Sequence, residues 1–251
     1  MRLILGLLFI LLLWFLWKKR SFFTYRNGVK EVVTGDPIKG LEFLRKAAKM
    51  GISPNQQVQV AYAELKYGDP NRARAALNLL LLNQKLKDPI KYQVKLMMDI
   101  LRLQEGELDE ARESLDALYE KGFRSTNFYA TYGYMAVLTG EKEYYTKIND
   151  EAYQYNKDNL VICDNYALSL HMAGDLDGAL AVYRELIAKE PKFPEAYYNY
   201  ACVLTKTGDT GKATEMLRVA LEQEFTGVTT IKEQQVRELL HSLEQSNSQE
   251  Q

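Results

Sequence analysis

The sequence has little of the chemistry that most enzymes and metalloproteins use. Its 251 residues include two histidines, His171 and His241, and two cysteines, Cys163 and Cys202. The motifs H-E-x-x-H, C-x-x-C and G-x-S-x-G do not occur. Two cysteines form no disulfide framework. We therefore expect no enzymatic activity, no metal, no cofactor and no small-molecule substrate.

Features of nucleotide and nucleic-acid binding are also missing. The stretch Gly208–Lys212 superficially resembles a phosphate-binding loop, but Lys206 stands where that motif needs a glycine and Ala213 where it needs a hydroxyl residue. Beyond the first 20 residues, 28 basic side chains face 33 acidic ones. Because a net negative chain is repelled by a phosphate backbone, we expect no nucleic-acid partner.

Long hydrophobic runs are missing except at the N-terminus. Residues 3–17, LILGLLFILLLWFLW, carry no charge. At about 1.5 Å per residue they span roughly 22 Å, and the flanking Lys18–Arg20 can snorkel to the headgroups of a bilayer core about 30 Å thick. No small-x-small cleavage site follows, so we predict an uncleaved transmembrane helix at residues 1–20 rather than a signal peptide.

The orientation of this anchor follows from its flanks. Residues 18–49 carry nine basic and three acidic side chains, whereas Arg2 is the one basic side chain before the run. The positive-inside rule then places the N-terminus outside and residues 18–251 in the cytoplasm.

What the rest of the sequence has in abundance is internal periodicity. Gly106, Gly140, Gly174 and Gly208 lie 34 residues apart, and Gly35 and Gly68 continue the pattern upstream. Small residues recur at most of the positions seven before and five after the glycine, and Leu or Ala stands twelve after it. Six copies share this register, at about residues 21–53, 54–87, 92–125, 126–159, 160–193 and 194–227.

Each copy has the pattern of an antiparallel helix pair. An apolar helical pattern ends at the glycine, which tolerates the left-handed conformation of a helix end, and a second apolar pattern follows. Asp36, Asp69, Asp175 and Asp209 follow their glycines and can cap the second helix. A single pair cannot bury its apolar face alone, so the copies must stack into an all-α solenoid over residues 21–227.

Residues 160–193 resemble the tetratricopeptide repeat (TPR) family. They supply an aromatic–small pair, a bulky residue, a Gly-Asp turn, a small residue, an aromatic and a terminal proline where that family has them: Tyr166-Ala167, Leu170, Gly174-Asp175, Ala179, Tyr183 and Pro191. Residues 194–227 match nearly as well. The resemblance implies a TPR α-solenoid with a concave face lined by the first helices.

Three departures from the pattern carry expectations of their own. Asp99 occupies a position of close helix contact, where an unpaired carboxylate would be costly. Four extra residues precede the third copy, so we interpret 88–99 as an irregular seam between two blocks of repeats. Tyr145 and Asn149 replace the small and bulky residues of the fourth copy, whose second helix should therefore pack loosely or shift.

The C-terminal segment is predicted to cap the solenoid. Thr229–Glu244 reads as one amphipathic helix, within a capping region at residues 228–245, and residues 246–251 form a polar tail. This helix either leaves the concave groove open or fills it.

The predicted binding residues stand three and six positions before the repeat glycines. They form an apolar and aromatic stripe that suits a partner helix or an extended hydrophobic peptide: Tyr62, Leu65, Ile100, Leu103, Tyr134, Val137, Leu168 and His171. Some TPR proteins grip a C-terminal carboxylate with a basic clamp. Asn165 and Asn199 match one clamp position, but the preceding Lys and Asn are missing, so this mode is not expected.

Charge divides along the chain. Residues 21–102 have a net charge of +7 and residues 103–251 a net charge of −12. Anionic lipid attracts Lys and Arg close to a membrane, so lipid contact is predicted through residues 3–20 and through the basic 21–102 region.

These observations combine into one functional hypothesis. The chain is interpreted as a non-enzymatic, membrane-anchored scaffold or adaptor that binds proteins at the cytoplasmic face of a membrane. Its architecture resembles that of bacterial envelope-assembly TPR proteins, which implies the bacterial inner membrane. The alternatives are a receptor for protein targeting or import, and a regulatory subunit of a membrane enzyme or protease complex.

Overall fold

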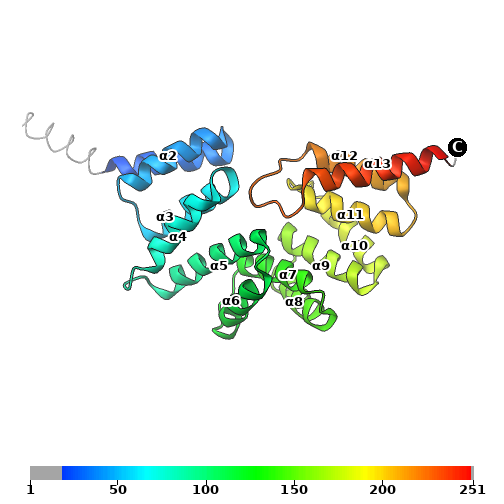
Figure 1. The fold of residues 1–251 in the computed structure, drawn as a ribbon, viewed down its shortest axis with the longest axis horizontal. Coiled ribbons are helices and arrows are strands. Elements are labelled where there is room, and N and C mark those ends of the chain that lie inside the picture. The colour runs from blue at the N-terminus through cyan, green and yellow to red at the C-terminus, as the bar shows by residue number, and fades with distance from the viewer. Residues whose placement is uncertain (1–18, 250–251) are drawn as a thin grey trace, which may run out of the picture. The chain divides into compact units, whose positions relative to one another are not determined.

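The computed structural model describes residues 19–249, which form helices and the connections between them, without a strand in that range (Figure 1). The all-α prediction is therefore confirmed there. Of the predicted anchor at 1–20, residues 1–18 lie outside the described residues, as do residues 250–251 of the tail. Within 19–249, no helix combines the length and the hydrophobicity needed to cross a membrane.

The elements follow one another as pairs of helices. Residues 19–34 are helical, and twelve further helices follow within the described range: α2 (Pro37–Lys49), α3 (Pro54–Tyr67), α4 (Pro70–Leu81), α5 (Asp88–Glu105), α6 (Leu108–Glu120), α7 (Thr126–Thr139), α8 (Lys142–Tyr155), α9 (Leu160–Ala173), α10 (Leu176–Ile187), α11 (Pro194–Lys206), α12 (Thr210–Glu222) and α13 (Glu233–Gln249). The chain divides into two compact units, Met1–Met98 and Asp99–Gln251.

The ends of the helices have the caps that the repeat pattern predicts, except that Gly35 and Gly68, unlike the other four repeat glycines, do not lie in the left-handed region. Gly140 and Gly174 end α7 and α9 in the left-handed region, with φ of 69° and 92°. A side chain at either position would be strained, which explains glycine there. The predicted aspartate caps are confirmed: each side chain accepts a hydrogen bond from a backbone N–H in the first turn of the following helix, at Asp36, Asp69, Asp175 and Asp209.

In the first unit, the helix at 19–34 and α2 are in close contact because glycine, which has no side chain, stands where they meet. A Cβ atom added to Gly40 would lie 2.6 Å from Val32 and 2.9 Å from the carbonyl oxygen of Gly28. Glycine at positions 28 and 40 thus lets the helix at 19–34 approach α2. Next to this contact, the nearly buried Glu64 of α3 forms two hydrogen bonds with the Arg45 guanidinium, at 2.7 and 2.8 Å.

In the second unit, the small residues of the repeat lie at the centre of each helix pair. Ala167 and Ala179 of α9 and α10, and Ala201 and Ala213 of α11 and α12, are fully buried in one apolar cluster. Tyr183 stacks on Tyr200 within this cluster, with ring centroids 5.4 Å apart. The bulky residues thus fill the space between successive pairs, as stacking of repeats requires.

The interpretation of 88–99 as an irregular seam between two blocks of repeats is right about the boundary, which falls between Met98 and Asp99, but wrong about the irregularity. Residues 88–105 form the single 18-residue helix α5, because four extra residues amount to about one turn added at its N-terminus. Asp99 is fully buried but paired: it accepts hydrogen bonds from Arg102, at 2.7 Å, and from the Ser114 hydroxyl, at 2.8 Å. These two donors offset the cost of burying the carboxylate.

The expected loose packing of α8 is also wrong. Tyr145 and Asn149 are buried, and the Asn149 amide donates to the carbonyl oxygens of Gly133, at 3.1 Å, and Tyr145, at 3.0 Å. A Cβ atom at Gly133 would lie 2.4 Å from Asn149 Oδ1. Glycine at position 133 of α7 therefore provides the room that the larger residues of α8 take.

The C-terminal helix begins later than predicted. It starts at Glu233 rather than Thr229, and residues 223–232 form a non-helical connection, which we call the α12–α13 connection. Gly227 and the β-branched run Val228–Ile231 disfavour a helix there, because both lose more conformational freedom in a helix than alanine does. Val236 and Leu243 of α13 are buried in the apolar cluster of this unit.

Candidate functional site

The predicted binding residues lie on the first helices of their repeats, but they differ in accessibility. Tyr62 and Leu65 belong to α3 in the first unit, where Tyr62 is exposed and Leu65 is buried in the core. Ile100 and Leu103 lie on α5 and are half-buried. These four residues stay predictions, because no observed contact tests them.

The second unit holds the other four predicted residues on the adjacent helices α7 and α9. Tyr134, Leu168 and His171 are half-buried, whereas Val137 is only 6% exposed and belongs to the core. Burial lowers the pKa of His171, and the nearby Lys206 lowers it further.

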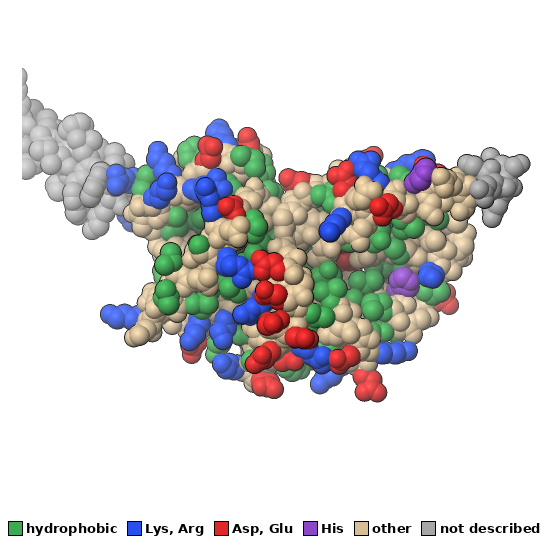
Figure 2. Space-filling view, in the orientation of Figure 1, with side chains coloured by type: hydrophobic (Ala, Val, Ile, Leu, Met, Phe, Trp, Pro, Cys, Tyr) green, Lys and Arg blue, Asp and Glu red, His purple; other side chains and the backbone are tan. Residues whose placement is uncertain are grey.

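Two accessible apolar residues on these helices were not predicted. Leu138 and Met172 are 42% and 44% exposed, and each stands two positions before a repeat glycine. Figure 2 shows hydrophobic side chains gathered over α7 and α9. The repeat register could have found both residues, since each lies four residues, about one helical turn, after the predicted Tyr134 or Leu168.

The α12–α13 connection, the long orange loop of Figure 1, contacts three different first helices. Gln104 of α5 donates a hydrogen bond to the carbonyl oxygen of Gly227. Glu195 of α11 accepts hydrogen bonds from the backbone N–H of Thr230, at 2.5 Å, and from its hydroxyl, at 3.1 Å. The Tyr134 side chain of α7 lies close to Thr230. The connection therefore lies on the face formed by the first helices.

Two acidic side chains lie in the same region. Asp164 of α9 and Glu195 of α11 are both buried. Asp164 accepts hydrogen bonds from the Asn199 amide, at 3.1 Å, and from the Tyr183 hydroxyl, at 3.2 Å. Burial raises the pKa of Asp164 to about 7, against these hydrogen bonds and with a further increase from the Glu195 carboxylate.

The two asparagines at the clamp position are engaged inside the fold. The Asn165 amide donates to the carbonyl oxygen of Ala130 at 2.8 Å, and the Asn199 amide donates to Asp164. Their amide groups serve helix packing in this structure.

A second polar region, on helices α6 to α8, is internally satisfied. Arg112 forms two hydrogen bonds with Glu141, at 2.6 and 3.0 Å, and lies over the Tyr144 ring at 4.5 Å. The hydroxyls of Tyr132 and Tyr144 both donate to Asp116 Oδ1 at 2.6 Å. Burial is the largest of the effects that raise the pKa of both tyrosines. These contacts join neighbouring repeats.

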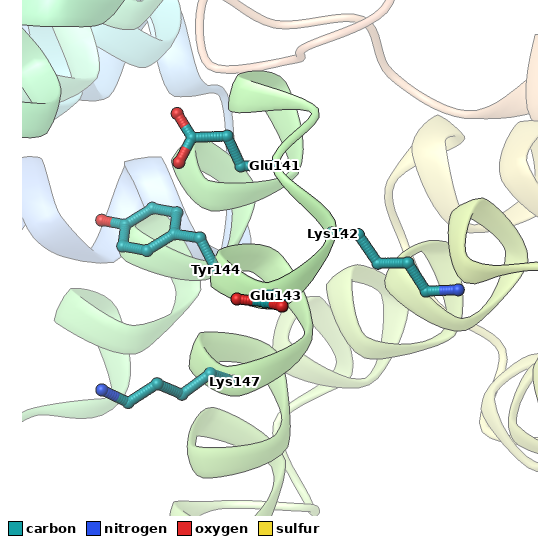
Figure 3. Close-up of a pocket in the computed structure, with 5 residues that line it drawn as sticks. All are labelled: Glu141, Lys142, Glu143, Tyr144 and Lys147. Atoms are coloured by element: carbon teal, nitrogen blue, oxygen red, sulfur yellow. The ribbon is translucent and has the colours of Figure 1, made fainter.

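A shallow depression on the first turns of α8 does not form a convergent site. Figure 3 shows that Lys142 extends away from Glu141, Tyr144 and Lys147, which line the other side. Among residues 19–249, no group of three or more His, Cys, Asp or Glu side chains is placed to hold a metal ion. The face formed by the first helices of the second unit is thus the best candidate.

Comparison with known proteins supports the repeat assignment. Residues 170–226 match the tetratricopeptide repeat family. Among curated proteins, none matches this sequence.

Solved structures share the fold at low identity. A tetratricopeptide repeat protein from Parabacteroides merdae is 13% identical, with a TM-score of 0.67 over 90% of this chain and 84% of that chain. A thermophilic TPR protein from Thermus thermophilus is 17% identical, with a TM-score of 0.59 over 76% and 98%. A chain of the APC/C hetero-tetramer Cut9-Hcn1 is 12% identical, with a TM-score of 0.69 over 89% and 42%.

Proposed function

Because the chain is a tetratricopeptide repeat protein, we propose that it is a non-enzymatic scaffold that binds other proteins through the first helices of residues 99–251. TPR proteins bind peptides or proteins in their grooves, and repeat solenoids in general use extended concave surfaces for this purpose. In this chain the partner contacts the face formed by the first helices.

The observation that carries the proposal is the apolar surface on α7 and α9. Leu138 and Met172 are large hydrophobic side chains that keep over two fifths of their surface in water, next to the half-buried Tyr134 and Leu168. Burying an exposed apolar side chain stabilises a complex by about 25 cal/mol per Å² of apolar surface, before the costs of association. A partner that covers these residues gains that energy.

The experiment is photo-cross-linking from position 134 in the full-length protein within intact cells. Capture of a distinct protein is expected, with loss of capture in the double variant Leu138→Glu/Met172→Glu. The matched control is Leu79→Glu/Leu82→Glu, which introduces the same charges at two exposed leucines of the first unit. Capture that survives the first pair of substitutions, or capture of nothing but the chain itself, contradicts the proposed site.

The location is a further part of the proposal: residues 1–20 anchor the chain in a membrane and residues 18–251 lie in the cytoplasm. Supporting it, the exposed side of the helix at 19–34 carries apolar side chains together with basic ones and no acidic one: Phe22, Phe23, Val29 and Val33, with Lys19, Arg20, Arg26 and Lys30. Such a mixture suits the headgroup region of an anionic membrane.

Alkaline carbonate extraction of cell membranes tests the anchor. The full-length chain should stay in the membrane fraction, and a protease added from the cytoplasmic side should degrade residues 21–251. Release into the soluble fraction contradicts the anchor, and protection from that protease contradicts the orientation.

A further inference from the structure

The contacts of the α12–α13 connection follow a regular path across the repeats. Counted back from the repeat glycines, Gln104 stands two positions before Gly106, Tyr134 six before Gly140, and Glu195 thirteen before Gly208. The α9 residue between them in this series is Asp164, ten before Gly174. The row therefore moves by three or four residues, about one helical turn, from each first helix to the next.

Such a diagonal row is the path of an extended segment laid across parallel helices. The connection occupies it with residues 227–230, which use backbone groups as well as side chains: the Gly227 carbonyl, the Thr230 N–H and the Thr230 hydroxyl. Phe225 and Ile231, on either side, pack against the apolar cluster of the unit. Residues 225–231 thus contact the first helices as a bound peptide would, although they belong to the same chain.

The face beneath the connection is acidic, while the residues that lie on it are neutral. Glu195 and Asp164 are both buried, and among residues 19–249 no lysine, arginine or histidine forms an ion pair with either of them. Thr230 supplies Glu195 with neutral donors only. A positively charged donor would form a stronger, charge-assisted bond with the same carboxylate.

We propose that residues 225–231 are an internal ligand of the concave face, and that the partner is an extended polypeptide segment whose lysine or arginine pairs with Glu195 and displaces them. This deepens the proposed function, on which it rests, by naming the partner's chemistry. The apparent affinity for the partner is the intrinsic affinity multiplied by the fraction of time for which the face is open, so the internal ligand weakens binding. A partner lacking the basic side chain gains no ion pair and competes poorly.

The test uses the full-length protein and two labelled peptides, read by fluorescence anisotropy. One has the sequence of residues 225–232, FTGVTTIK, and the other has lysine at the place of Thr230. The lysine peptide should bind wild-type protein about tenfold more tightly than the first, and Glu195→Gln should abolish that preference. Equal affinity of the two peptides, or a preference that survives Glu195→Gln, overturns the proposed chemistry.

Releasing the internal ligand gives the second measurement. Thr230→Pro removes both the N–H and the hydroxyl that bind Glu195, whereas Thr230→Ser keeps both. The proline variant should bind the lysine peptide at least tenfold more tightly than wild type, and the serine variant should bind like wild type. Affinity that does not rise in the proline variant, at unchanged helical circular dichroism, overturns the internal-ligand role.

If the proline variant does not fold, hydrogen exchange of the wild-type protein tests whether residues 225–231 are an internal ligand. The backbone amides of residues 226–231 should exchange faster when the lysine peptide is bound, because the connection leaves the face. Unchanged or slower exchange overturns the proposal. The proposed function is judged separately: protein capture at position 134 without release of residues 225–231 refutes only the internal ligand, whereas absence of capture refutes the function itself.

Discussion

The ionisation of Asp164 leads to a prediction about stability that can be worked through in numbers. Burial raises the pKa of this carboxyl group from its ordinary 3.8 to about 7. In the unfolded chain the group loses its proton near its ordinary pKa, but in the folded chain it keeps the proton up to about pH 7. Between these values the folded state binds more protons, so the free energy of unfolding falls as the pH rises.

The size of the effect follows from the same two values. A difference of roughly 3 in pKa corresponds to roughly 4 kcal/mol of lost stability as an upper bound. The loss is absent below about pH 4, grows through pH 5 and 6, and is complete above about pH 7. For a unit of this size, 1 kcal/mol changes the Tm by about 2–4 °C, so the Tm should fall by several degrees between pH 5 and pH 8.

Asp164→Asn removes this dependence, because an amide does not titrate. At pH 5 the variant should be about 1–2 kcal/mol less stable than wild type, since the new NH₂ group faces the donors of Asn199 and Tyr183. At pH 8 the two proteins should differ less, or the variant should be the more stable one, because it buries no charge.

The assay is urea unfolding of the full-length protein, followed by circular dichroism at pH 5, 6, 7 and 8. Asp158→Asn, at an exposed loop position, is the control. Its free energy of unfolding should change with pH as that of the wild type does. The lowered pKa of His171 works in the opposite direction, since its contribution is lost as the pH falls, but it is common to all three proteins and cancels in their differences. Equal slopes for wild type and Asp164→Asn refute the reasoning.

Three further predictions concern packing and caps, and all are measured by urea unfolding. Gly133→Ala should cost about 1–3 kcal/mol, because the new Cβ meets Asn149 Oδ1, and adding Asn149→Ala should recover part of the loss; a neutral Gly133→Ala contradicts this contact. Arg45→Ala should cost about 3 kcal/mol by leaving Glu64 buried without its partner, and adding Glu64→Gln should restore stability; additive losses speak against the pair. Asp175→Ala should cost about 1 kcal/mol through the lost cap of α10, whereas Asp175→Asn should cost little.

The repeat architecture was predictable because it depends on residue spacing alone. A glycine every 34 residues, with small residues at fixed offsets, specifies helix pairs whose ends and contacts are set locally. The aspartate caps at positions 36, 69, 175 and 209 are local in the same sense, since each acts on the next turn of its own chain. Both features are present in the structure.

The wrong expectations share a different cause. Asp99 and Asn149 each look unsuitable when only their own repeat position is considered, yet each has a partner on another helix: Ser114 for Asp99 and Gly133 for Asn149. Spacing within one helix cannot reveal which side chain of the next helix compensates. The extra turn of α5 was missed for a related reason, because an insertion can lengthen a helix as readily as interrupt it.

The candidate site was predictable to the level of the helix face. The first helices and the apolar positions Tyr134 and Leu168 follow from the repeat register, but the register gave Val137 the same weight as the exposed residues beside it. Whether a side chain at such a position is covered depends on the curvature of the stack.

The sequence by itself determined the helices, their caps, the small residues at the helix contacts and the division of charge, because each of these depends on neighbours along the chain or on composition. Only the tertiary structure decided that residues 223–232 lie against α5, α7 and α11. Gly227 is 123 residues from Gln104, and Thr230 is 35 residues from Glu195. Hydrogen bonds between groups so far apart in sequence form only once the stacked repeats have brought the first helices into one face.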